Sequence, residues 1–186
     1  MIDTSKEKLL HSILYFANNT KYLGATKLAK LLYYLDFLHY KETGKSVTGQ
    51  QYFAWNFGPV PVDVYKEITG EEDYALGLQG LISTQLYGKF RKVKTSNEIT
   101  FDKDIFSKRE LRLLKEISTI FKKARAKEIV KVAHLKNHPW DITRQEKGEN
   151  KLIDYNLVFR GLEEEEHVQA IREQQKERNE MAELFG

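Results

Sequence analysis

One segment, residues 26–43, constrains the fold more than any other part of the chain. Its sequence is TKLAKLLYYLDFLHYKET, and it stops directly before Gly44. Apolar side chains fall on almost every side of a helix built from this sequence, and such a helix is normally buried all round. We therefore expect residues 26–43 to form a central buried helix, with the other helices of the protein packed around it.

Other segments repeat apolar residues at helical spacing. They are residues 5–17, 107–123 and 126–136. The second begins with Ser107 and Glu110, three positions apart, which is the pattern of a capping box at a helix N-terminus. These segments are the expected neighbours of the central helix.

Strand signals are fewer. Residues 51–57 carry aromatic side chains on both faces, which is typical of a strand covered on both sides. A second short strand is predicted at residues 98–101, paired with residues 90–94, whereas four glycines make residues 69–88 a predicted loop. The predicted fold class is therefore α+β, mostly helical, with a small antiparallel sheet beside the central helix.

The composition narrows the class of protein. A chain of 186 residues with 41% hydrophobic residues can bury a core of its own, and it contains no cysteine for disulfides or thiolate metal sites. The start, MIDTSKEKLL, lacks the apolar run of a signal peptide, and no stretch approaches the ~20 apolar residues of a membrane helix. We expect a cytoplasmic protein with no membrane partner.

The charge is unevenly distributed. Residues 161–186 contain eight Glu against three basic residues, so this segment carries −5, and with a net charge of +3 residues 1–160 carry +8. We predict a body of residues 1–160 and an acidic helical tail of residues 161–186. The tail either orders on contact with a partner or is a frayed extension. The first alternative makes Glu166, Ile171 and Phe185 candidate partner contacts.

A stiff turn follows the aromatic strand. Gly58-Pro59-Val60-Pro61 restricts the backbone, because proline fixes φ and glycine permits conformations that other residues resist. Pro61 also suits the first turn of a following helix. The turn either only defines the fold or presents its neighbours to a protein partner; those neighbours are Trp55, Asn56, Phe57 and Tyr65.

Asp36 is the one carboxylate in the apolar part of the central helix. A buried carboxylate must accept hydrogen bonds, since an unpaired one costs several kcal/mol. We interpret Asp36 as an anchor that binds donors in the turn at residues 56–60. The alternative, a catalytic acid, lacks a second carboxylate at a fixed spacing.

His134 and His138 are four residues apart, a spacing found in zinc sites. The glutamate of that motif is missing, Pro139 interrupts the helix, and Asp141 is the only nearby third ligand. We therefore predict no metal and no other cofactor. His134 is expected to be a hydrogen-bonding residue, with Trp140 packing a helix end onto the core.

Neither a catalytic nor a strong nucleic-acid signal is present. No nucleophile motif occurs, so we predict no catalytic residues and no enzyme activity. Residues 103–136 contain eleven Lys or Arg against four acidic residues, but without interleaved aromatics. This basic face is either solvated, attracted to an acidic partner or to the tail, or part of a nucleic-acid-binding regulator.

Three separated blocks resemble one known family. They are Lys30 to Asp36 (KLLYYLD), Gly58-Pro59-Val60, and His134 with Pro139-Trp140. Over about residues 5–160 the chain is similar to the Panacea antitoxin domain, also called SocA-like or GepA-like. The resemblance assigns motif roles to Tyr33, Asp36, Gly58, Pro59, Pro61, His134 and Trp140.

This resemblance implies a non-enzymatic antitoxin of a toxin–antitoxin system. Such a protein neutralises a cognate toxin by direct protein–protein binding. One related member instead hands its toxin to a protease, so the alternatives are a proteolytic adaptor or a nucleic-acid-binding regulator, of phage or prophage origin.

Overall fold

The computed structural model describes residues 4–70, 78, 81–87 and 90–185, and the side chains of residues 87, 90, 91, 184 and 185 lie outside the description. The helices are α1 (Thr4–Asn19), α2 (Ala25–Thr43), α3 (Val62–Thr69), α4 (Lys108–Ile120), α5 (Ala126–Ala133), α6 (Pro139–Lys147), the 3-10 helix η1 (Tyr155–Phe159) and α7 (Glu166–Phe185). The strands form two antiparallel pairs: β1 (Phe53–Trp55) with β2 (Gly58–Val60), and β3 (Ile82–Tyr87) with β4 (Phe90–Thr95).

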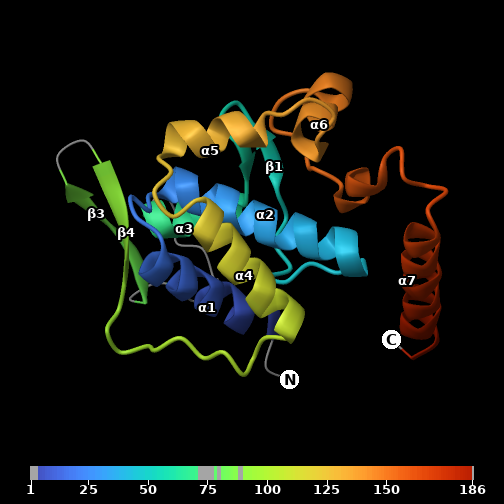
Figure 1. Ribbon diagram of the computed structural model, residues 1–186, viewed down its shortest axis with the longest axis horizontal. Coiled ribbons are helices and arrows are strands. Elements are labelled where there is room, and N and C mark those ends of the chain that lie inside the picture. The colour runs from blue at the N-terminus through green and yellow to red at the C-terminus, as the bar shows by residue number, and fades with distance from the viewer. Residues whose placement is uncertain (1–3, 71–77, 79–80, 88–89, 186) are drawn as a thin grey trace.

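Helix α2 crosses the middle of the molecule, with α1 and α4 on one side and α5 on the other (Figure 1). Its buried positions cover every side of the helix and include Leu28, Leu32 and Leu35, none of them exposed. The helix ends at Gly44, which has a φ of +66° and donates its amide to the Tyr40 carbonyl oxygen. The predicted fold class and central helix are confirmed.

The second sheet differs from its prediction. Residues 98–101 form no strand, and β4 pairs instead with β3, inside the segment predicted to be a loop. Ile99 and Phe101 pack against the core, Phe101 with its ring 5.0 Å from that of Tyr15 on α1. The ring of Phe101 therefore faces a helix rather than a neighbouring strand. Gly77, Gly80 and Gly88, which favoured a loop, lie outside the described residues.

The region after α5 also differs in detail. The predicted helix over residues 126–136 ends at Ala133, and a separate helix, α6, begins at Pro139. Asn137 between them has a φ of +62°, in the left-handed region, which does not continue a helix. Pro139 occupies the first helical position, where its missing N–H costs nothing.

Helix α7 runs beside the end of α2 at the far right of Figure 1. Val168 and Ile171 are buried against Phe159, in a small cluster separate from the main core. Gln175 on α7 donates to the hydroxyl of Tyr40 on α2 at 2.8 Å. The division into a body and a tail remains a prediction. None of the helices in the described ranges combines the length and hydrophobicity that a membrane span requires.

Candidate partner-binding surface

The β1–β2 pair, hereafter the hairpin, presents two exposed residues at its tip. Trp55 pairs with Gly58, which leaves Asn56 and Phe57 as the two turn residues. Gly58 has a φ of +101°, a conformation that favours glycine. Phe57 is 72% exposed, whereas Ala54 and Val60 in the strands are buried. The hairpin therefore places an aromatic side chain in solvent at a fixed position.

Lys30 on α2 holds the hairpin against the central helix by a hydrogen bond. Its fully buried ammonium donates to the Pro59 carbonyl oxygen at 2.8 Å. A Cβ at Gly58 would lie 2.6 Å from the Lys30 Cε atom, so only glycine admits this close approach. Burial lowers the pKa of Lys30 from 10.5 to about 7.

Asp36 binds a different segment from the one predicted. Its carboxylate accepts from the amides of Val47 and Thr48, each at 2.8 Å, from the Thr48 hydroxyl, and from the Tyr52 hydroxyl at 2.7 Å. Burial raises the pKa of Asp36, and the four donors oppose that shift. Asp36 is thus an anchor for the connection between α2 and β1. The tie to residues 56–60 that we predicted for Asp36 is made by Lys30.

Trp140 binds the hairpin, and His134 stacks on Trp140. Their rings are parallel to within 3°, with centroids 4.0 Å apart, and the Trp140 Nε1 donates to the Trp55 carbonyl oxygen at 2.9 Å. Burial and the nearby Lys30 charge lower the pKa of His134. The exposed His138 lies at the N-cap of α6. Within the described residues no three metal-ligating side chains converge.

An aromatic pair continues from the hairpin onto α3. The rings of Trp55 and Tyr65 meet edge to face, 5.4 Å apart, and both are half-buried. Pro61, at the N-cap of α3, connects the two elements. Four residues singled out from the sequence, Trp55, Asn56, Phe57 and Tyr65, therefore belong to the hairpin and the helix after it.

The tail residues are divided by the structure. Glu166 is exposed at the start of α7, whereas Ile171 is only 6% exposed and packs within the chain. A Cβ at Gly44 would lie 2.6 Å from the Ile171 Cγ2 atom, so the two elements are closely packed. The side chain of Phe185 lies outside the described residues.

The basic face is partly neutralised. Arg109 and Arg112 on α4 both contact Glu42, at 3.1 and 2.7 Å, and Arg112 also pairs with Glu116. Arg125 lies over the ring of Tyr22, 4.9 Å from its centroid. Two cations of the basic face are therefore occupied by carboxylates.

Sequence reasoning missed the two buried lysines of α2. Lys27 donates to the carbonyl oxygens of Lys21, Phe121 and Ala124, each at 2.7 Å. Two of these acceptors follow directly after α4, so Lys27 supplies hydrogen-bond donors to free carbonyl groups at the end of that helix. Burial lowers its pKa to about 8. Both lysines interrupt the apolar pattern of a helix that was predicted to be buried. This pattern could have indicated two structural hydrogen-bond sites, because a buried ammonium must find acceptors.

The fold and this surface define a helical module that holds a rigid aromatic hairpin against its central helix. The family of antitoxin SocA-like proteins, Panacea domain, matches residues 28–141, and the chain belongs to that family. The matched range contains α2 from Leu28 onward, the hairpin, His134 and Trp140. No curated protein sequence and no solved structure matches the chain significantly.

Proposed function

We propose that this protein is an antitoxin that neutralises a cognate toxin by direct binding, without catalysis or a cofactor. The observation that carries the proposal is the 72% exposure of Phe57 at the tip of the hairpin. Phe57 does not stand alone, because the half-buried rings of Trp55 and Tyr65 belong to the same hairpin and the helix after it. A group of aromatic side chains on a rigid element is a candidate contact.

The hairpin is suited to binding because its position is fixed before a partner arrives. Lys30 contacts β2, and Trp140 contacts β1, so each strand is held by a different helix. Rigid aromatic side chains lose little conformational entropy on binding, and most of the contact energy is then retained. We assign Phe57, Trp55, Asn56 and Tyr65 to the toxin contact.

The tail supplies a second contact in this proposal. Its first turns hold it on the body through Val168 and Ile171, while Glu166 and the outer face of α7 remain exposed. We therefore assign Ile171 to the attachment of α7 and Glu166 to the partner contact. The negatively charged helix and the basic body present surfaces of opposite charge to the toxin, which favours a partner with complementary charges at both places.

The proteolytic adaptor differs from this proposal only in the fate of the bound toxin. A regulator that binds nucleic acid would need free cations on the basic face, and the pairing of Arg109 and Arg112 with Glu42 weighs against it. A cytoplasmic location and an origin in a prophage are parts of the proposal that rest on the family.

Calorimetric titration against the purified product of the adjacent reading frame tests the proposal. We expect wild type to bind and Phe57→Ala to lose affinity by about tenfold or more, as for an interface hot spot. Leu86→Ala is the matched control, because Leu86 is 62% exposed on the other hairpin. Equal losses for both variants, or no binding by wild type, would refute the proposed surface.

A further inference from the structure

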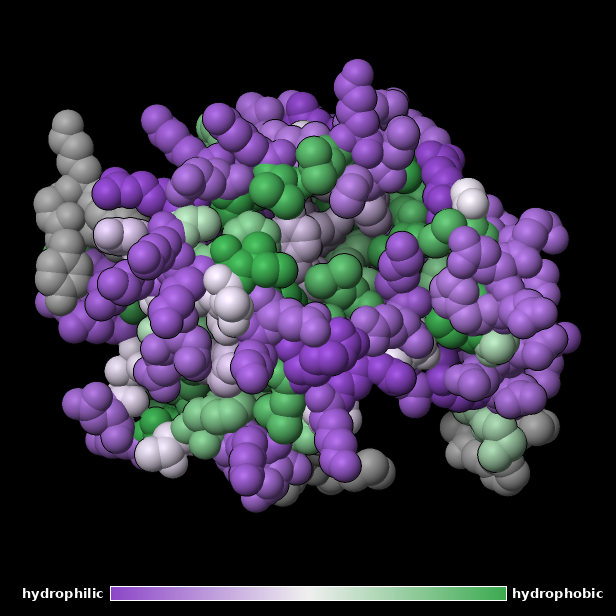
Figure 2. Space-filling view, in the orientation of Figure 1, coloured by the Kyte–Doolittle hydropathy of each residue, from purple (hydrophilic) through white to green (hydrophobic). Residues whose placement is uncertain are grey.

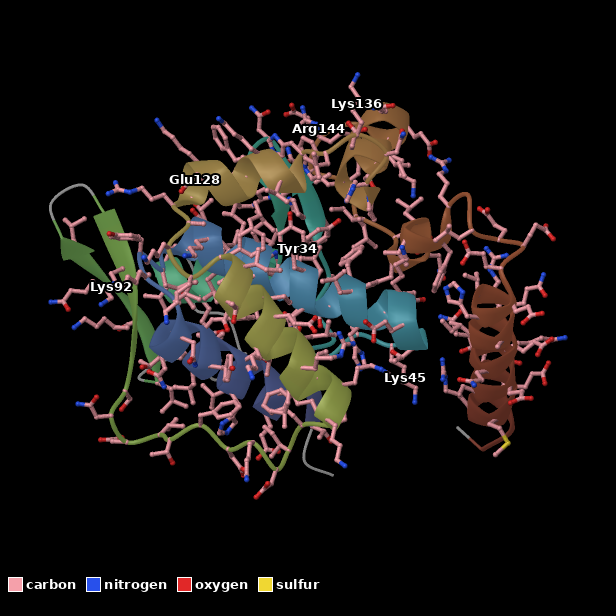
Figure 3. The ribbon with its side chains drawn as sticks, viewed as in Figure 1. Tyr34, Lys45, Lys92, Glu128, Lys136 and Arg144 are labelled. Carbon is pink, nitrogen blue, oxygen red and sulfur yellow. The ribbon has the colours of Figure 1, made fainter. Side chains whose placement is uncertain are left out.

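A pocket opens along α2, on the same helical face as Lys30 but nearer the end of the helix. It has a volume of about 290 Å³ and lies between the middle of α2, the start of α6 and η1. Figure 2 shows a hollow with apolar and weakly polar side chains in front of α2, and Figure 3 places Tyr34 in this area. Tyr33, Tyr34, Phe37 and Leu38 line it from α2.

The walls of the pocket are apolar and its rim is basic. Pro139 and Val158 close its sides, and Lys41 and Arg160 stand among the lining residues, which include no carboxylate in the described part of the chain. Arg160 pairs with Glu146 at 2.6 Å, and both side chains are about half exposed. Lys41 is exposed and forms no ion pair within the ranges that the structure describes.

The size of the pocket limits its ligand. A volume of about 290 Å³ is at the lower end of that of small-molecule sites, and it suits one or two side chains of a protein. Leu38, which is 40% exposed, offers apolar surface that a side chain entering the pocket would cover. A carboxylate beside that side chain would meet Lys41, which still lacks a counter-charge.

We propose that this pocket binds an apolar side chain of the toxin that is flanked by an acidic residue. The inference rests on the proposed function and adds a second, chemically specific contact to it. The start of α6 couples the two contacts, since Pro139 lines the pocket and Trp140 holds the hairpin. The toxin therefore contacts the protein at two places, the hairpin and the pocket, and the start of α6 sets their relative position.

The test is calorimetric titration of the purified toxin from the adjacent reading frame with Leu38→Lys and Lys41→Glu. Each change should weaken binding by about tenfold, as the loss of a central contact does. Lys45→Glu is the matched control, because Lys45 is exposed just beyond α2 and does not line the pocket. It should bind within about twofold of wild type. Raising the salt concentration should weaken wild type more than Lys41→Glu.

Thermal unfolding of each variant shows whether it is folded. If Leu38→Lys unfolds, the exposed Lys41→Glu decides the matter. The pocket assignment would be overturned if Lys41→Glu and any folded Leu38→Lys bound the toxin as tightly as wild type. The proposed function would still stand if Phe57→Ala had lost affinity. Failure of wild type to bind the toxin would overturn both.

Discussion

The Lys30 ammonium on α2 donates a hydrogen bond to the Pro59 carbonyl oxygen on β2, across 2.8 Å. The Lys30 side chain reaches this acceptor by passing Gly58, at a distance that leaves no room for a Cβ atom. The central helix and the Gly-Pro-Val strand thus pack together because the long side chain of Lys30 passes the position where Gly58 has no side chain. The position of the exposed Phe57 depends on that fit.

Replacing Gly58 by alanine should destabilise the protein in two ways. Alanine at a φ of +101° is strained, and its Cβ would lie 2.6 Å from Lys30 Cε. The backbone strain alone costs about 1–2 kcal/mol. Gly148→Ala is the control, since Gly148 has a φ of +91° and no atom within 4 Å of the added Cβ. Urea denaturation should show a larger loss for Gly58→Ala, and equal losses would mean that the close approach is unimportant.

Replacing Lys30 by methionine should change how stability depends on pH. In the wild type the pKa of Lys30 is lowered from 10.5 to about 7 by burial, so above pH 7 the unfolded state binds more protons than the folded state. The free energy of unfolding of wild type, relative to Lys30→Met, should therefore rise by about 2 kcal/mol between about pH 7 and pH 9.

Denaturation of both proteins across that pH range measures the difference. Lys27, whose pKa is lowered to about 8, is present in both proteins and cancels. A difference that stays constant with pH would show that Lys30 remains charged in the folded protein at all these values.

Replacing Asp36 by alanine should destabilise the fold rather than remove a specific activity. Four buried donors, from Val47, Thr48 and Tyr52, would lose their acceptor. Each unsatisfied donor costs about 1–3 kcal/mol, so the total should exceed about 3 kcal/mol. Asp104→Ala, at an exposed position, is the control. A variant that melts like wild type yet no longer binds its partner would place Asp36 in a functional site.

The sequence predicted the central helix and the capping box of α4 well, because both are set by local patterns. The structure has the Ser107–Glu110 box as expected, with both reciprocal hydrogen bonds. The strand predicted at residues 98–101 was wrong, since Ile99 and Phe101 have the composition of a strand but pack against the core, Phe101 beside Tyr15 of α1. Local propensity does not record which element an apolar side chain will meet.

The same limit applies to the candidate surface. Asp36 was recognised as an anchor from its apolar surroundings, but its partners lie 11 to 16 residues further along the chain, in a segment without a distinctive motif. The role of Lys30 depends on a contact with Pro59, 29 residues away. Such pairs become visible only when the path of the chain is known.

Deleting residues 162–186 should leave the body folded but uncover Phe159 and weaken binding to the toxin. Two buried apolar side chains, Val168 and Ile171, stabilise the attachment of α7 by about 1.5–3 kcal/mol each. Deleting only residues 176–186 is the control for folding, because it keeps both side chains. Circular dichroism and calorimetric titration compare the two deletions. Unfolding of the longer deletion would refute the division at residue 160.

The most direct test of the central claim is a growth-rescue experiment in which the toxin is also quantified. The toxin from the adjacent reading frame is induced with and without this protein, and its amount is followed by immunoblot. Direct neutralisation predicts that growth recovers while the amount of toxin stays unchanged, and that Phe57→Ala rescues less than Leu86→Ala. Absence of rescue, or rescue accompanied by disappearance of the toxin, would contradict direct neutralisation, and disappearance would favour the adaptor mechanism.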